Sequence, residues 1–104
     1  MSHWVKVALL EEIPRLGARV VRTEDKDIGV FRTQDDQIFA INNACPHKSG
    51  PLSQGIVFGD KVACPLHSWK ISLKDGRAEE PDVGQTACYN TKVEDGFVYL
   101  DIKA

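Results

Sequence analysis

Cysteine is scarce in this chain. Only three of its 104 residues are cysteines, at positions 45, 64 and 88. Such a small and odd number argues against the disulfide framework of a small secreted domain. Where a reducing compartment keeps thiols free, cysteines that lie close to histidines more often indicate bound metal.

Excess positive charge and long apolar runs are also lacking. Thirteen lysines and arginines face fifteen acidic residues, which gives a formal net charge of −2. This balance argues against nucleic-acid binding, which usually needs a basic face. No apolar run approaches the roughly 18 residues of a membrane span. The N-terminus shows no basic stretch followed by an apolar one, so we expect no signal peptide, no membrane partner and a cytoplasmic location.

Glycine-rich nucleotide-binding motifs are missing as well. No glycine fingerprint follows an expected strand, which argues against a dinucleotide site. Internal repeats and linkers are not visible, and the length fits one domain over residues 1–104. Apolar residues make up 42% and charged residues 27%, ordinary values for a globular protein. We therefore expect one domain without a dinucleotide-binding site.

Short β-type runs separated by turn residues fill the chain. Apolar and polar residues alternate at Val5 and Val7, and turn residues separate the later runs. Asp95-Gly96 between two such runs is a strong signal for a tight hairpin. The expected strands, besides the first, cover residues 19–23, 28–33, 38–42, 57–58, 61–63, 69–73, 89–94 and 97–102.

The expected fold class is all-β. Regular short strands with frequent turns predict antiparallel sheets that form a sandwich or a barrel-like domain. Only residues 9–16 suggest a helix, and Pro14 limits it to a turn or a single helical turn.

Two short motifs combine cysteine with histidine. The first ligand motif is Cys45-Pro46-His47, the second is Cys64-Pro65-Leu66-His67, and residues 48–63 separate them. Two cysteines and two histidines in this arrangement are the ligand set of a Rieske [2Fe–2S] centre. Thiolates are soft donors for iron, and neutral imidazoles make the cluster easier to reduce. The motifs predict one such cluster held by Cys45, His47, Cys64 and His67.

Other chemistry fits the same four residues less well. Structural zinc takes Cys₂His₂ ligands, but its spacings usually pair cysteine with cysteine and histidine with histidine. A catalytic Cys-His dyad would leave the second motif without a role. The neighbouring prolines stiffen both motifs, and Gly50 and Gly55 permit a sharp backbone path.

Two further residues have simple structural interpretations. We expect Cys88 to be a small, half-buried hydrophobic residue at the start of a strand. Trp69, two residues after the second motif, is expected to anchor the loop or the core.

With these motifs, the chain resembles Rieske-type ferredoxin domains over nearly its full length. It is most similar to the small subunit of assimilatory NAD(P)H-dependent nitrite reductase. The resemblance implies a small cluster-binding subdomain of two loops, at about residues 43–52 and 64–69. It also implies that Cys45 and Cys64 bind the buried iron, and that His47 and His67 bind the outer iron. The stretches that carry the resemblance are residues 43–52, 55–57, 64–73 and Pro81-Asp82 with Gly84.

Departures from other Rieske proteins predict a potential near the low end of the Rieske range. Respiratory members carry a disulfide between the two loops, where this chain has Gly50 and Leu66. They also have a serine that bonds a sulfur where this chain has Trp69. The nitrite reductase branch often has a cysteine where this chain has Gln85.

The resemblance implies a role in electron transfer, with no catalytic site in this chain itself. The partner would be the nitrite reductase large subunit, which in the family carries FAD, an iron–sulfur cluster and sirohaem and reduces nitrite to ammonium. One alternative is a separate ferredoxin that supplies an aromatic-ring dioxygenase, with an oxygenase or a reductase as partner. A third hypothesis is a non-redox interaction module with a structural metal.

Overall fold

The chain folds almost entirely from β-strands. A computed structural model describes residues 4–23, 26–44, 51–65, 69–79 and 84–102. Across these ranges there are ten strands, two short 3₁₀ turns and no α-helix. The all-β prediction is therefore confirmed. In the same ranges, no helix has the length and apolar character needed to cross a bilayer.

The lower sheet joins the two ends of the described chain. Its antiparallel order is β1 (Trp4–Leu9), β10 (Phe97–Asp101) and β9 (Thr91–Glu94). Asp95 and Gly96 connect β9 to β10 with φ values of +52° and +79°, as expected for the tight hairpin. The turn η1 (Leu10–Glu12) follows β1, which confirms the expected single helical turn.

The middle sheet has four strands. Its order is β2 (Gly17–Arg22), β3 (Asp27–Arg32), β4 (Ile38–Asn42) and β8 (Cys88–Tyr89). The strands expected at residues 28–33 and 38–42 form β3 and β4 and pair as a hairpin, with Val30 opposite Ala40. The strand β8 pairs with β4, although the whole upper sheet separates them in sequence.

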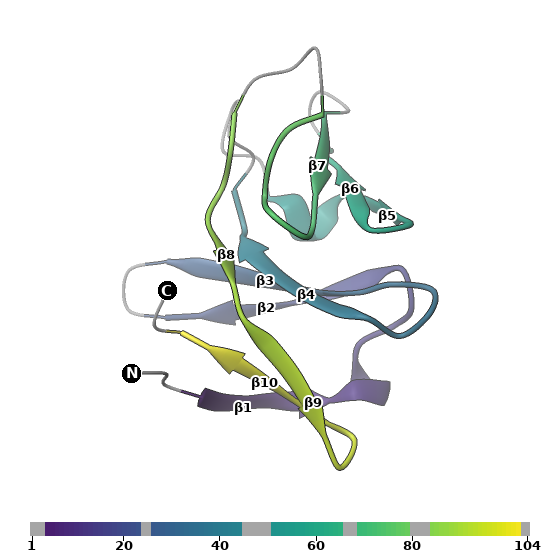
Figure 1. Cartoon of the computed structure of the whole chain (residues 1–104), viewed down its shortest axis with the longest axis vertical. Helices are drawn as coiled ribbons and strands as arrows, with labels where there is room; N and C mark the ends of the chain where they lie inside the picture. The colour runs from purple at the N-terminus through teal and green to yellow at the C-terminus, as the bar shows by residue number, and fades with distance from the viewer. Residues whose placement is uncertain (1–3, 24–25, 45–50, 66–68, 80–83, 103–104) are drawn as a thin grey trace.

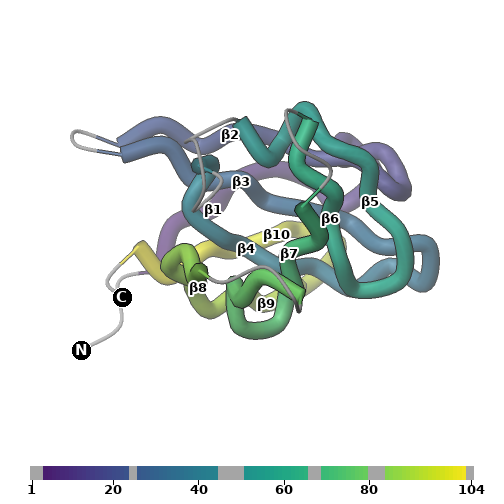
Figure 2. Tube along the Cα trace, turned by 90° about the horizontal axis from the view of Figure 1, so that it is seen from above, coloured from purple at the N-terminus to yellow at the C-terminus, as the bar shows by residue number. Residues whose placement is uncertain are grey.

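The upper sheet is small, and Cys64, the first residue of the second ligand motif, follows its middle strand. Its strands are β5 (Ile56–Phe58), β6 (Lys61–Ala63) and β7 (Lys70–Ser72), in that order, after the turn η2 (Leu52–Gln54). Figure 1 shows three layers, with this sheet above the middle one and the lower sheet beneath. Figure 2, seen from above, shows the upper sheet lying over β3 and β4.

Two hydrophobic cores lie on opposite faces of the middle sheet. In β3, Phe31 belongs to the upper core, whereas Ile28 and Val30 belong to the lower one. In β4, Ile41 belongs to the upper core and Ala40 to the lower one, as the alternation of side chains along a strand requires. The other buried members of the upper core are Leu52, Val57, Val62, Cys64, Ile71 and Leu73.

Candidate metal centre

Cys64 is the described member of the four predicted ligands. It follows the last residue of β6, and only 2% of its surface is exposed. Its backbone N–H donates a hydrogen bond of 2.7 Å to the carbonyl oxygen of Trp69. This bond brackets the second ligand motif, because it joins the residue that opens the motif to a residue just beyond it.

The side chain of Asn43 fixes the two sides of the first ligand motif. Its Oδ1 accepts a hydrogen bond of 2.7 Å from the backbone N–H of Ser53. Its own backbone N–H donates to the carbonyl oxygen of Asp27 at 2.8 Å. Asn43, two residues before the motif, is thereby tied both to β3 and to the turn after the motif. Sequence reasoning missed this role, although asparagine commonly bonds to nearby backbone in loops.

The residues that flank the two motifs meet in one core. Leu52, which follows the first motif, is fully buried in the same cluster as Cys64. Trp69 is partly buried and packs against that cluster. Its predicted role as a loop or core anchor is therefore confirmed. The flanks of both motifs therefore pack against one core.

Gly55 allows the two flanks to approach closely. A Cβ atom built at Gly55 would lie 2.1 Å from the carbonyl oxygen of Ala63, the residue before Cys64. Its φ of −81° is available to any residue, so the requirement is for space. Gly55 is therefore a point of contact between neighbouring backbones, and not the site of the sharp backbone path expected from the sequence.

Three predicted ligands lie outside the described residues: Cys45, His47 and His67. Gly50 and Leu66 lie outside them as well. Within the described residues, no group of three metal-ligating side chains is found, as expected when only Cys64 of the four is included. The chemistry of Cys64 fits a cluster ligand, because it is a free thiol, shielded from water and fixed at a loop boundary.

A short ion pair lies on the upper sheet at Lys61, the first residue of β6 and so at the end of this strand away from Cys64. Lys61 Nζ lies 2.9 Å from Glu79 Oε2. The hydrogen bond from Lys61 lowers the pKa of Glu79, and the charge of Lys70 adds to the effect. The same bond to Glu79 raises the pKa of Lys61. Both shifts favour the charged forms, so the pair consists of an ammonium group and a carboxylate at neutral pH.

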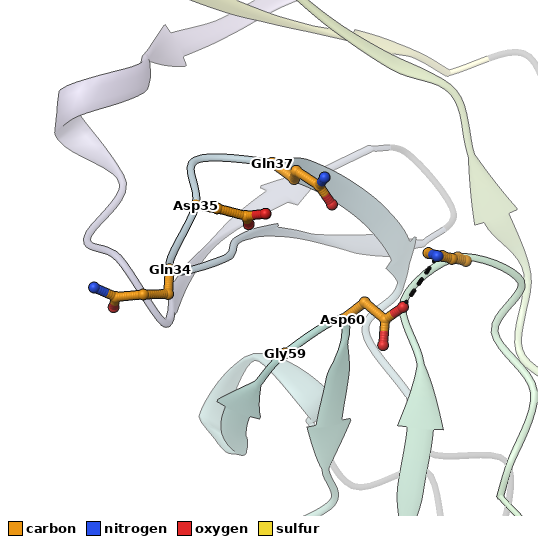
Figure 3. Close-up of a pocket in the computed structure, with 6 residues that line it drawn as sticks. Gln34, Asp35, Gln37, Gly59 and Asp60 are labelled. Atoms are coloured by element: carbon orange, nitrogen blue, oxygen red, sulfur yellow. Dashed lines mark ion pairs between the residues drawn. The ribbon is translucent and has the colours of Figure 1, made fainter.

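A polar cleft of about 400 Å³ lies at the other end of the upper sheet. It opens between the β3–β4 turn and the β5–β6 turn (Figure 3). Lys74 Nζ lies 3.3 Å from Asp60 Oδ2 on its wall. Asp60 precedes β6 and Cys64 follows it, so the cleft and the candidate metal centre lie at opposite ends of this strand.

The burial predicted for Cys88 is wrong. The residue does begin β8, but it is an exposed free cysteine. The strand has only two residues, and Tyr89 turns its ring toward the lower core. Because side chains alternate along a strand, Cys88 points to the other face, at the edge of the sheet. Gln85 also lies near this edge, where its side-chain amide donates to the carbonyl oxygen of Asp75 at 3.1 Å.

Residues 3–101 match the model of the Rieske-like [2Fe-2S] domain family. A curated relative is the ferredoxin component of the naphthalene 1,2-dioxygenase system of Pseudomonas aeruginosa. It is 30% identical over 102 residues, which cover 97% of each chain.

Solved structures show the same fold. The NMR structure of the E. coli protein NirD superposes with a TM-score of 0.85 at 29% identity, covering all of both chains. A second structure, of a protein provisionally described as the small subunit of an NADPH nitrite reductase, has a TM-score of 0.83 at 25% identity. It covers 94% of this chain and 97% of its own. The proteins similar to this chain thus include a dioxygenase ferredoxin and a provisionally described nitrite reductase small subunit.

Proposed function

Because this chain belongs to the family of Rieske-like [2Fe-2S] domains, and so carries one [2Fe–2S] cluster as an electron-transfer ferredoxin, we propose that it is the small subunit of an NAD(P)H-dependent nitrite reductase. The sequence resemblance around both ligand motifs supports this role. So does the likeness to a provisionally described nitrite reductase small subunit. The partner is then a large subunit that reduces nitrite to ammonium.

In this proposal Cys45 and Cys64 bind the buried iron, and His47 and His67 bind the outer iron. When bound, the cluster accepts and releases one electron at a time. The carrying observation is Cys64, a free thiol that is 2% exposed and shares a core with Leu52 after the first motif. Its surroundings exclude water from one side of the site, while Asn43 and Trp69 hold the chain on either side of the motifs.

Metal analysis and EPR test the ligand assignment. We expect two irons per chain, no stoichiometric zinc, and a Rieske-type EPR signal after reduction with dithionite. Cys64→Ser should lose the signal, whereas Cys88→Ser should keep it, because Cys88 is exposed and lies outside both motifs. One zinc per chain without visible colour would refute the assignment.

Reconstitution with the large subunit tests the biological role. The large subunit of nitrite reductase, with its FAD and sirohaem, should form a complex with this chain and consume NAD(P)H with nitrite. The midpoint potential should lie near the low end of the Rieske range, roughly −150 to +300 mV. A complex that forms equally well with the cluster-free Cys64→Ser chain, at full activity, would contradict electron relay.

A second candidate is a ferredoxin for an aromatic-ring dioxygenase. The 30% identity to the naphthalene dioxygenase ferredoxin over 97% of both chains favours it. Rapid reduction by an NADH-dependent ferredoxin reductase, followed by electron delivery to a ring-hydroxylating oxygenase, would support this role. The absence of any complex with the nitrite reductase large subunit would strengthen it.

A further inference from the structure

The upper sheet has one fully buried face and one face that is open. Val57, Val62 and Ile71 are cross-strand neighbours, and each is at most 4% exposed. Directly paired residues point to the same side of a sheet, and the next residues along each strand point to the other. The outer face therefore carries two rows: Ile56, Ala63 and Lys70, then Phe58, Lys61 and Ser72.

Ile56 is unusually exposed for a large apolar residue. It is 72% exposed, whereas the next most exposed large hydrophobic residues, Leu16 and Val93, each reach 43%. Phe58 lies on the same face and is 39% exposed. Single exposed apolar residues are common, but two neighbours on an open edge strand form a patch that usually has a partner. The strand β5 is such an edge, since it pairs only with β6 among the described strands (Figure 1).

The first of these rows adjoins the candidate metal centre along all three strands. Ile56 follows Gly55, on the flank of the first motif. Ala63 precedes Cys64, and Lys70 follows Trp69, whose carbonyl oxygen accepts the bond from Cys64. Since electron transfer slows steeply with distance, a protein that docks on this row would lie close to the cluster ligands.

The charges beside the apolar patch are mainly positive. Lys61 and Lys70 both lie on the outer face, and Glu79 neutralises one of them through its ion pair with Lys61. The chain as a whole has a net charge of −2, so this face differs in sign from the average of the molecule. Such a surface complements a partner that presents an apolar centre with acidic groups at its rim.

We propose that the outer face of β5, β6 and β7 is the docking surface for the protein that exchanges electrons with this chain. The partner presents an apolar centre with acidic groups at its rim. Ile56 and Phe58 pack against the apolar centre, and Lys70 attracts the acidic groups. This inference rests on the proposed function, in which that partner is the nitrite reductase large subunit.

Charge variants at position 56 test the surface. Ile56→Glu and Ile56→Lys both remove the apolar contact but differ in the sign of the added charge. Ile56→Glu should raise the Kd for the large subunit by at least about tenfold, as for a central interface residue. Ile56→Lys should weaken binding less. Val93→Glu serves as the control, since Val93 is an exposed apolar residue of the lower sheet, and it should stay within about twofold of the wild type.

A second pair of variants tests the role of charge. Lys70→Glu should slow association with the large subunit several-fold at low salt, and Lys70→Arg should not. For every variant, the EPR signal and the reduction by dithionite report that the cluster is intact, and a measured midpoint potential accounts for any change in driving force.

Three outcomes would overturn the proposal. If the wild type binds the large subunit and Ile56→Glu binds equally well, the docking surface is wrong and the proposed function stands. If the wild type binds neither the large subunit nor a dioxygenase reductase, both fail together. If Ile56→Glu only converts a dimer of this chain into a monomer in sedimentation experiments, and electron transfer is unchanged, the face binds a second copy instead.

Discussion

Gly55 is the residue at which the flanks of the two ligand motifs touch. A methyl group there would overlap the carbonyl oxygen of Ala63 at 2.1 Å. Gly55→Ala should therefore lower the free energy of unfolding by about 2–3 kcal/mol, the cost of overpacking a rigid site. Urea denaturation of the cluster-loaded chain measures this change in the free energy of unfolding.

Gly59→Ala is the matched control for this substitution. A Cβ at Gly59 meets no atom within 4 Å, but the φ of +56° is unfavourable for alanine. We expect a loss of about 1 kcal/mol, from backbone strain alone. Equal losses at both glycines would show that Ala63 can move away from position 55 at little cost.

Asp36 forms ion pairs with two guanidinium groups. Arg15 Nε lies 2.8 Å and Arg32 Nη2 lies 2.7 Å from Asp36 Oδ1. The hydrogen bonds from Arg15 and then Arg32 lower the pKa of Asp36 to about 2, from an ordinary value of 3.8. The unfolded chain thus binds a proton at a higher pH than the folded chain does. The stabilisation is complete above about pH 4 and is lost as the pH falls toward 2.

The stability difference between the wild type and Asp36→Asn should shrink over this pH range. Asparagine tolerates the φ of +66° at this position, so the substitution removes mainly the charge. Urea midpoints at several pH values between 6 and 2 measure the difference, and loss of the cluster in acid affects both proteins alike. A difference that stays constant with pH would contradict the role of the carboxylate.

At the scale of elements, Arg32 ties η1 to the β3–β4 turn. Its Nη1 donates to the carbonyl oxygens of Leu10 and Ile13 at 3.1 Å and 2.8 Å, while Nε and Nη2 bind Asp36. Its side chain is only 11% exposed, whereas that of Arg15 is 54% exposed.

Replacing each arginine by lysine separates the two contributions. Lysine keeps the charge but cannot reach all these acceptors with a planar fork. Arg32→Lys should lower the free energy of unfolding by about 1–3 kcal/mol, because it removes a hydrogen-bond donor from the carbonyl oxygen of the fully buried Ile13. Arg15→Lys should change it by less than about 1 kcal/mol, as for an exposed pair. Similar losses for both variants would mean that the carbonyl contacts contribute little to stability.

Local sequence predicts the hairpins well, because each hairpin needs only two neighbouring runs and a turn. The β3–β4, β5–β6 and β9–β10 hairpins all form where the sequence places them. The pairing of β4 with β8 depends on contacts across the whole insertion, which no local pattern encodes. The prediction that Cys88 is half-buried failed for a related reason. A two-residue edge strand shows no alternation of apolar and polar residues from which its buried face can be predicted.

The candidate site, too, has features that the local sequence predicts and features that it does not. Each ligand motif is continuous in sequence, so both motifs could be recognised from residue types and spacing. The bond from Ser53 to Asn43 and the approach of Gly55 to Ala63 join residues from different segments. The two rows of the outer face follow from strand register, which a shift of one residue would reverse. These features needed the three-dimensional structure.

At the scale of the molecule, both cores use the same two strands. Because β3 and β4 contribute side chains above and below, neither core can be lost without exposing the other. We predict a single unfolding transition for the chain, in accord with the expected single domain.

Two single-tryptophan variants report on the two halves. Trp69→Phe leaves Trp4 in the lower sheet, and Trp4→Phe leaves Trp69 beside the upper core. Both fluorescence signals should change at the same urea midpoint, together with the visible absorption of the cluster. An earlier transition at Trp69 would show that the upper half unfolds separately.

The upper sheet is an insertion whose two ends meet. The chain leaves the middle sheet after Asn42 and returns at β8, and the N–H of Asn42 donates to the carbonyl oxygen of Ala87 at 2.7 Å. Residues 43–87 therefore form a cassette with adjoining entry and exit points. A protein engineer could transplant such a cassette only onto an antiparallel sheet that also offers apolar residues in the places of Phe31 and Ile41, because these two side chains complete the upper core.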